Sequence, residues 1–251
     1  MAVRKNIVIT GASAGLGEGM ARLFAARGRD LALCARRRDR LDALAAELTE
    51  RHPGIRVIVR ELDVNDHDRV ATVFDEFRTE LGGLDRVIVN AGLGKGQPVG
   101  TGHFAANRQT VETNLVAGLA QCEAAVSIFR EQNAGHLVVV SSFSAVRGMP
   151  RTMTAYAASK AGIAALADGI RTDLLATPIS VTTVFPGYIE SEMTRRTAGR
   201  TPLIASAEAG ARALVKAIER EPAKAYVPSW PWTPLSLLVR ALPASVFRRI
   251  V

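Results

Sequence analysis

The 251-residue sequence has little of what marks secreted, metal-binding or membrane-spanning chains. Its two cysteines, Cys34 and Cys122, form no CxxC pair, so nothing indicates a disulfide framework. Histidine occurs only four times, without the spacing of metal ligands, and we predict no metal site. No apolar run approaches the roughly 18–20 residues that span a bilayer. The N-terminus passes from two basic residues into a strand-like run, without the apolar core of a leader, so we expect a cytoplasmic protein.

Aromatic residues are also scarce, at 5%, and they do not alternate with basic residues. The net charge of +8 is carried mainly by arginine, since lysine occurs only at positions 5, 95, 160, 216 and 224. A platform on which nucleic-acid bases could stack is therefore missing, and we predict no nucleic-acid partner. The positive field would instead favour anionic cofactors or acidic lipid surfaces.

Strand-like and helix-like segments alternate along the whole chain. Short β-branched runs predict strands at Asn6–Thr10, Asp30–Ala35, Arg56–Leu62, Arg86–Asn90, His136–Ser141, Ser180–Phe185 and Ala225–Pro228. Stretches rich in Ala, Leu, Arg and Glu predict helices near 15–28, 37–51, 66–81, 104–132, 153–176 and 206–220. Such alternation is typical of βαβ units. We therefore predict an α/β fold: a Rossmann-like, doubly wound, mainly parallel sheet of about seven strands, with helices on both faces and ligands at its carboxyl edge.

A glycine-rich turn, TGASAGLG at 10–17, follows the first predicted strand. Glycine lets the backbone turn tightly and approach a pyrophosphate, while the start of the next helix supplies N–H donors and positive potential. The turn predicts dinucleotide binding. The candidate cofactor contacts within it are Gly11, Ser13, Gly15, Leu16 and Gly17.

The end of the second predicted strand indicates which nicotinamide cofactor is bound. A carboxylate there would bind the ribose hydroxyls and repel a 2′-phosphate. This chain instead has Arg36 and Arg37, and guanidinium groups bind phosphate through charge-assisted hydrogen bonds. We predict NADP(H) as the cofactor; solvated arginines without a ligand are the alternative.

Two further short motifs stand at the ends of predicted strands, where adenine and ribose contacts would fall. They are weak signals singly, and their order along the chain strengthens both. They contain Asp63 and Val64 after the third strand, and Asn90, Ala91 and Gly92 after the fourth.

Tyr156 and Lys160 lie four residues apart in AYAASKAG. On a helix this spacing puts both side chains on one face, about 5–6 Å apart at Cβ. There an ammonium group would lower the pKa of the phenol from roughly 10 toward neutrality. The pair predicts acid–base chemistry beside the cofactor.

Taken together, the chain resembles the short-chain dehydrogenase/reductase family over residues 5–228. The resemblance rests on TGASAGLG at 10–17, NAG at 90–92, Asn114, the Ser141–Ser142 pair, YAASK at 156–160 and PG at 186–187. It implies an oxidoreductase with a catalytic group of Asn114, Ser142, Tyr156 and Lys160, assembled as a homodimer or homotetramer.

The chemistry of each residue agrees with these implied roles. Tyr156 would protonate the alkoxide that hydride addition produces, and Lys160 would also bind the nicotinamide ribose. Ser142 would donate to the substrate oxygen, although Ser141 or Ser144 could take that role. Asn114 lies in a helical stretch where asparagine is a poor helix former, and the resemblance implies that it holds a proton-relaying water. A satisfied core amide is the alternative.

The segment GYIESEMTRR, which follows the sixth predicted strand, would cover the nicotinamide in the family. Its cofactor-binding candidates, with the end of that strand, are Pro186, Gly187, Ile189 and Ser191. The residues expected to wall the substrate cleft are mostly apolar and indicate a hydrophobic, lipid- or steroid-like carbonyl compound that is reduced. They are Leu93, Phe143, Met149, Pro150, Met153, Tyr188, Ile189 and Met193.

We expect a single domain over 1–251, with a mainly cofactor-binding half at 1–92 and a catalytic and substrate half at 93–228. The tail at 229–251 is rich in Trp, Leu and Arg. It would cap the cleft, pack between subunits or lie on a membrane surface. The overall expectation is a carbonyl reductase or alcohol dehydrogenase that uses NADP(H). An NADP(H)-binding sensor or scaffold without turnover is the alternative.

Overall fold

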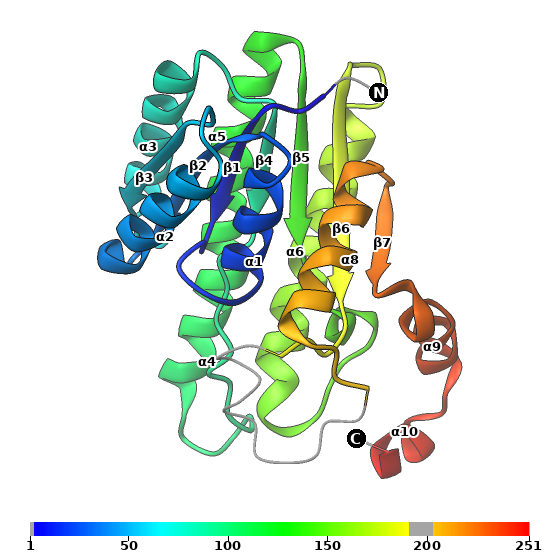
Figure 1. The fold of residues 1–251 in the computed structure, drawn as a ribbon. Coiled ribbons are helices and arrows are strands. Elements are labelled where there is room, and N and C mark those ends of the chain that lie inside the picture. Colours follow the sequence, from blue (N-terminus) through cyan, green and yellow to red (C-terminus); the bar gives the residue numbers. More distant parts are fainter. Residues whose placement is uncertain (1–2, 191–202, 251) are drawn as a thin grey trace.

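The computed structural model describes residues 3–190 and 203–250, and its centre is a sheet in which every strand pairing is parallel (Figure 1). The strands are β1 Asn6–Thr10, β2 Asp30–Ala35, β3 Val57–Glu61, β4 Arg86–Val89, β5 Gly135–Val140, β6 Ile179–Pro186 and β7 Lys224–Val227. Their order in the sheet is β3-β2-β1-β4-β5-β6-β7. The predicted doubly wound α/β fold is confirmed.

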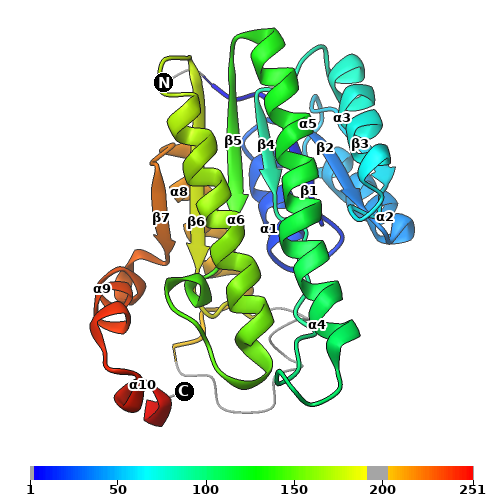
Figure 2. The ribbon, with the colours of Figure 1, turned by 180° about the vertical axis from the view of Figure 1, so that it is seen from behind.

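Helices cover both faces of the sheet. One face carries α1 Gly15–Ala25, α2 Arg38–Arg51 and α8 Ala207–Glu219 (Figure 1), and the other carries α3 His67–Leu81, α5 Ala117–Gln132 and α6 Thr154–Asp173 (Figure 2). Alternating side chains of β1 supply both layers, because Ile7 and Ile9 pack toward α1 while Val8 packs toward α3 and α5. The central strands are buried on both sides, which explains their continuous apolar runs.

The chain reverses its direction of winding at β1, which has β2 on one side and β4 on the other. In open parallel sheets a crevice forms at this point, outside the carboxyl ends of the strands. The connection after β4 includes α4 Phe104–Val111 and a π-helical turn, Glu112–Val116, that leads into α5. Both lie at that edge of the sheet (Figure 1).

The tail forms two helices, α9 Ser229–Ala241 and α10 Ala244–Ile250, that pack against the region after β5. Trp232 is only 3% exposed, and Phe143 and Met149 lie in the same apolar cluster. Arg147 donates to the backbone oxygens of Val239 and Leu242, which fixes the end of α9. Within the described residues, no helix is both long and apolar enough to cross a membrane.

A buried ionic cluster lies at the amino edge of the sheet. The Arg86 guanidinium contacts Glu219 at 2.6 Å, Glu221 at 3.1 Å and the Nδ1 atom of His136 at 2.8 Å. Because the guanidinium donates to Nδ1, the imidazole is neutral and carries its proton on Nε2, 2.9 Å from Oγ1 of Thr182. Burial, together with the Arg86 charge, lowers the pKa of His136 to about 3.

This cluster predicts acid-sensitive folding. The unfolded chain takes up a proton on His136 below its ordinary pKa of 6.5, whereas the folded chain does not until about 3, so stability falls as the pH drops through this window. We expect the free energy of unfolding, measured with urea, to fall by about 2 kcal/mol from pH 7 to pH 5. The carboxyl group of Glu221, whose pKa is lowered from 4.5 to about 2, contributes only at lower pH.

The variant His136→Gln should be less stable than the wild type at pH 7 and at pH 5, because it disturbs the contacts of Arg86. Its free energy of unfolding should, however, change much less between the two pH values than that of the wild type. A wild-type protein with equal stability at the two pH values would contradict the assignment. So would a variant that keeps the full difference.

Candidate active site

A cavity of about 430 Å³ lies at the carboxyl edge of the sheet, between the loops that follow β1 to β6. It brings together most of the site residues predicted from the sequence. These are Gly11, Ser13, Gly15, Leu16, Arg36, Arg37, Asp63, Val64, Asn90, Ala91, Gly92, Ser142, Tyr156, Lys160, Pro186, Gly187 and Ile189. Gly17 and Asn114 do not line the cavity, and Ser191 and Met193 fall outside the described residues.

The glycine-rich turn has the backbone geometry that its sequence predicts. Gly11 and Gly15 have φ values of +64° and +59°, in the region that favours glycine. Helix α1 begins at Gly15 after Ala14, whose methyl group cannot accept a hydrogen bond from the first N–H groups of the helix. These donors and the positive end of the helix dipole therefore remain available to an anion at the cavity.

Gly17 serves the turn through packing, and its contact with a cofactor stays a prediction. A Cβ atom at this position would stand 2.4 Å from the backbone oxygen of Gly11 and 2.8 Å from Nδ2 of Asn90. Glycine is therefore required for the helix to lie against its own turn. The residue shapes the turn and does not itself line the cavity.

The motif after β4 holds two strand ends together. The hydroxyl of Thr10 accepts from the backbone N–H groups of Asn90 at 3.0 Å and Ala91 at 3.1 Å. In return, Nδ2 of Asn90 donates to the backbone oxygen of Thr10 at 2.9 Å. Thr10 is fully buried, and our sequence analysis did not assign it a role. Its place directly before Gly11 was the available signal.

Arg36 and Arg37 both line the cavity beside the glycine-rich turn. Nε of Arg37 donates to the hydroxyl of Ser13 at 3.2 Å, and Nη1 of Arg36 lies 3.9 Å from Oδ2 of Asp63. The Arg36 side chain is 65% exposed, so its charge can meet a ligand that enters from solvent. The neighbouring Arg38 points elsewhere and forms an ion pair with Asp42 on α2.

The two serines after β5 have different partners. The Ser141 hydroxyl donates to the backbone oxygen of Lys160 at 2.7 Å and so ties β5 to α6. The Ser142 hydroxyl lies close enough to the phenol of Tyr156 to lower its pKa, and it accepts from the backbone N–H of Ser144 at 3.2 Å. This arrangement favours Ser142 over Ser141 and Ser144 as the group beside the reacting oxygen.

Tyr156 and Lys160 share one face of α6, as their spacing predicts. The expected effect of Lys160 on the phenol is wrong for this structure, however. Withdrawal of the phenol from solvent raises the pKa of Tyr156, and the hydrogen bond from Ser142 only partly opposes this. The Lys160 ammonium instead donates to the backbone oxygen of Val140 at 2.9 Å, and burial lowers its pKa to about 8.

Asn114 is a buried amide whose hydrogen bonds hold the loop after β4. Its Oδ1 accepts from the N–H of Leu93 at 2.7 Å, and its Nδ2 donates to the oxygen of Leu93 at 2.9 Å and to Ser159 at 3.0 Å. It also approaches Lys160: Oδ1 of Asn114 and Nζ of Lys160 each lie 3.3 Å from the place of a Cβ on Gly92. Glycine at 92 thus keeps the space between the two polar atoms open.

The predicted substrate wall is only partly located on the cavity. Leu93 and Ile189 line it, whereas Phe143, Met149 and Met153 pack beneath the C-terminal helices. They pack there because the tail covers them: the ring of Trp232 lies 4.6 Å from that of Phe143 and 5.6 Å from that of Tyr188, measured between centroids. Sequence reasoning could not find this contact, because it depends on where the tail folds back.

The cavity also has polar lining residues that our sequence analysis missed. They include Asn65, Lys95 and Thr113. Asn65 is held by Asp63, and its Oδ1 accepts from the hydroxyl of Thr113 at 3.2 Å. Asn65 belongs to the same strand-end loop as Asp63 and Val64, so its position next to the predicted motif was a usable signal.

Comparison with known proteins identifies the class. The family model described as short chain dehydrogenase matches residues 5–201. An uncharacterized oxidoreductase of Mycobacterium tuberculosis (strain H37Rv) is 56% identical over 246 residues, which cover 98% of this chain and 97% of that protein. An 11-beta-hydroxysteroid dehydrogenase of Arabidopsis thaliana is 34% identical over 192 residues, 76% of this chain and 54% of its own length.

Among solved structures, an alcohol dehydrogenase from the archaeon Thermococcus sibiricus, complexed with 5-hydroxy-NADP, superposes with a TM-score of 0.77 at 26% identity. The match covers 88% of this chain and 94% of that chain. The chain therefore belongs to the short-chain dehydrogenase family. It is an oxidoreductase of this type, and the family binds a nicotinamide cofactor.

The close approach of Trp232 to Gly187 gives a test of the site's outer wall. A Cβ on Gly187 would lie 2.1 Å from Cε2 of the indole, so Gly187→Ala should displace the ring and destabilise the protein by roughly 1–3 kcal/mol. Gly148→Ala is the matched control, because nothing lies within 4 Å of its added methyl group. Urea unfolding of both variants measures the difference.

A double-mutant cycle with Trp232→Leu separates this clash from other effects. Once the indole is removed, the added methyl group at 187 should cost far less, with a coupling energy above about 0.5 kcal/mol. If the two substitutions have additive effects on the free energy of unfolding, α9 does not pack against Gly187.

Proposed function

We propose that this chain is an NADP(H)-dependent oxidoreductase that interconverts a carbonyl and a secondary alcohol by hydride transfer, with reduction of a hydrophobic substrate as its main direction. The observation that carries the proposal is the placement of the Tyr156 phenol, the Ser142 hydroxyl and the Lys160 ammonium on one cavity. That cavity also holds the glycine-rich turn and two arginines.

The residues present suit a dinucleotide. The turn offers backbone N–H groups and the α1 dipole to a pyrophosphate, and the cavity extends from there to Tyr156 and Ile189 at the other end. Lys160 and the strand-end residues Pro186 and Gly187 would hold the nicotinamide half. The bound cofactor would supply the hydride that reduces the carbonyl carbon.

The raised pKa of Tyr156 suits the reductive direction. A phenol that keeps its proton at neutral pH can donate it to the alkoxide oxygen formed when the carbonyl accepts hydride. The Ser142 hydroxyl, on the same cavity as this phenol, would stabilise the developing negative charge on that oxygen. Lys160, whose pKa of about 8 leaves it mostly charged at neutral pH, would bind the nicotinamide ribose.

The preference for NADP(H) rests on Arg36 and Arg37. Both guanidinium groups line the cavity at the end of β2, and no carboxylate occupies the two positions after that strand. The related archaeal structure carries an NADP derivative, which supports the same choice. The hydrophobic substrate is supported by Leu93 and Ile189 on the cavity and by the related plant steroid dehydrogenase.

The central test is Tyr156→Phe, which removes the proposed proton donor. We expect kcat for NADPH-dependent reduction of a carbonyl panel to fall by roughly 100- to 10,000-fold, because general acid catalysis is worth about this much. NADPH binding, measured by fluorescence, should change little. Tyr226→Phe is the matched control, since this tyrosine packs on Phe185 and does not line the cavity.

Full turnover by Tyr156→Phe would overturn the proposed mechanism. A wild-type protein that binds NADPH but turns over no carbonyl or alcohol in the panel would favour the sensor or scaffold instead.

Cofactor choice is tested with Arg36→Ala and Arg37→Ala. Loss of a charge-assisted phosphate contact should raise KM for NADPH by roughly 10- to 100-fold, with little change in KM for NADH. Arg38→Ala removes the same charge from a side chain that pairs with Asp42 outside the cavity, and it should leave both values nearly unchanged. A wild-type preference for NADH would refute the assignment.

A further inference from the structure

Large apolar side chains that reach solvent gather at one edge of the molecule. They lie in segments that follow the carboxyl ends of β4, β6 and β7, which a parallel sheet brings to the same side. Helices α4, α9 and α10 all lie at the end toward which the strand arrows point (Figure 1). The most exposed of these side chains are Val99, Phe104, Leu203, Trp230, Leu237 and Leu238.

Helix α9 has two apolar faces, and only one of them is covered. The inner face is formed by Trp232, Ser236 and Val239, which are buried. The outer face repeats at i, i+3, i+4 and i+7 and reaches solvent. It consists of Pro234, Leu237, Leu238 and Ala241, with Leu237 67% exposed. A helix that packs in a soluble protein carries a polar stripe at these positions.

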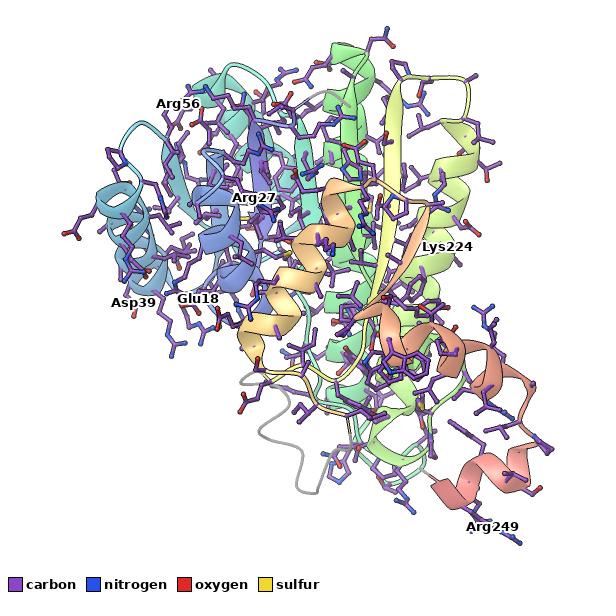
Figure 3. All side chains as sticks on the ribbon, turned by 45° about the vertical axis from the view of Figure 1, so that its right-hand side comes forward. Glu18, Arg27, Asp39, Arg56, Lys224 and Arg249 are labelled. Atoms are coloured by element: carbon purple, nitrogen blue, oxygen red, sulfur yellow. The ribbon has the colours of Figure 1, made fainter. Side chains whose placement is uncertain are left out.

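Helices α9 and α10 themselves carry charge of one sign. After Glu221 the chain contains no aspartate or glutamate, and its basic residues there include Arg240, Arg248 and Arg249. All three are exposed, and in the described part of the chain none of them has an ion-pair partner. Figure 3 shows Arg249 on α10 at the outer end of the molecule, far from the labelled acidic residues Glu18 and Asp39.

The two helices are held firmly with this face outward. The Arg147 guanidinium donates to backbone oxygens at the end of α9 and lies 4.8 Å from the centre of the Phe247 ring on α10. Phe247 and Val239 are buried in the cluster beneath. Leu237 and Leu238 are therefore exposed on a helix whose other face is packed against the protein.

We propose that this α9–α10 surface, formed by Trp230, Leu237, Leu238, Arg240, Arg248 and Arg249, binds the surface of an anionic lipid membrane. An amphipathic helix with aromatic and leucine side chains beside arginines is the pattern of an interfacial segment. A second copy of the chain would bring two patches that each carry these three arginines together, because a twofold contact uses the same patch on both subunits. The charge thus favours an anionic occupant.

The inference does not depend on the proposed reaction, since none of the six residues lines the cavity. Binding through this surface would orient the protein on the bilayer. The carboxyl edge of the sheet, and with it the region of the cavity, would face the lipid. The amino edge, with its buried ionic cluster, faces away.

The test is sedimentation of the full-length protein with vesicles. One set contains phosphatidylcholine alone, and the other contains phosphatidylcholine with phosphatidylglycerol. We expect binding to the anionic vesicles that weakens as salt is raised, because salt screens charges at the surface.

Two variants probe the two parts of the surface. Arg240→Gln/Arg248→Gln/Arg249→Gln should lower partition onto anionic vesicles by roughly 100-fold, from about fivefold for each charge. Trp230→Ser/Leu237→Ser/Leu238→Ser should lower it by at least about tenfold, through the loss of buried apolar area.

Matched controls change the same chemistry at the opposite edge. Arg27→Gln/Arg51→Gln/Arg220→Gln removes three exposed charges near the starts of strands, and Leu175→Ser removes a leucine that is 75% exposed. Both should bind vesicles nearly as the wild type does. Urea unfolding and NADPH binding confirm that every variant is folded.

Three results would overturn the proposal. The first is equal binding to both vesicle types without an effect of salt, and the second is binding that the α9–α10 variants do not weaken. The third is a fall in the oligomeric mass of the apolar variant in gel filtration, without any wild-type vesicle binding, which would show that a second copy covers the face.

Discussion

The cavity side of the molecule depends on one buried cation. Lys160 is 5% exposed, and its ammonium is satisfied by the carbonyl of Val140 at the end of β5. Its own backbone oxygen accepts from Ser141, so two hydrogen bonds fasten α6 to that strand end. A buried charge is costly unless it is hydrogen-bonded, and these contacts therefore set the position of α6 closely. Tyr156, one turn earlier on the helix, is thereby placed beside Ser142.

The two edges of the sheet differ in their charged groups and in their exposure to solvent. The carboxyl edge carries the glycine-rich turn, the exposed Arg36 and the cavity. At the amino edge, charges pair internally: Arg86 contacts Glu219, Glu221 and His136 within the fold. Breaking a buried pair of this kind costs far more than losing an exposed one. Stability can thus reside at the edge that needs no access to solvent, and this leaves the other edge open for binding.

Local patterns in the sequence were enough to predict most of this arrangement. The strand ranges Asn6–Thr10 and Asp30–Ala35 were predicted to the residue, because central parallel strands are continuous apolar runs bounded by clear breaks. The glycine turn and the Tyr156–Lys160 spacing were likewise readable. The pKa of Tyr156 was not, because burial and the partner of Lys160 depend on tertiary packing. The packing position of Trp232 could not be predicted either, because the sequence of the tail contains no local signal for where it packs.

That docking joins the outer surface of the molecule to the cavity. Trp232, on the inner face of α9, leaves no space for even a methyl group on Gly187, and Gly187 lines the cavity. The outer face of the same helix carries Leu237 and Leu238 into solvent. Because a packed interior has discrete arrangements and resists gradual deformation, α9 cannot shift without opening the contact at Gly187. The outer leucines and the cavity wall are therefore connected through one helix and the side chain of Trp232.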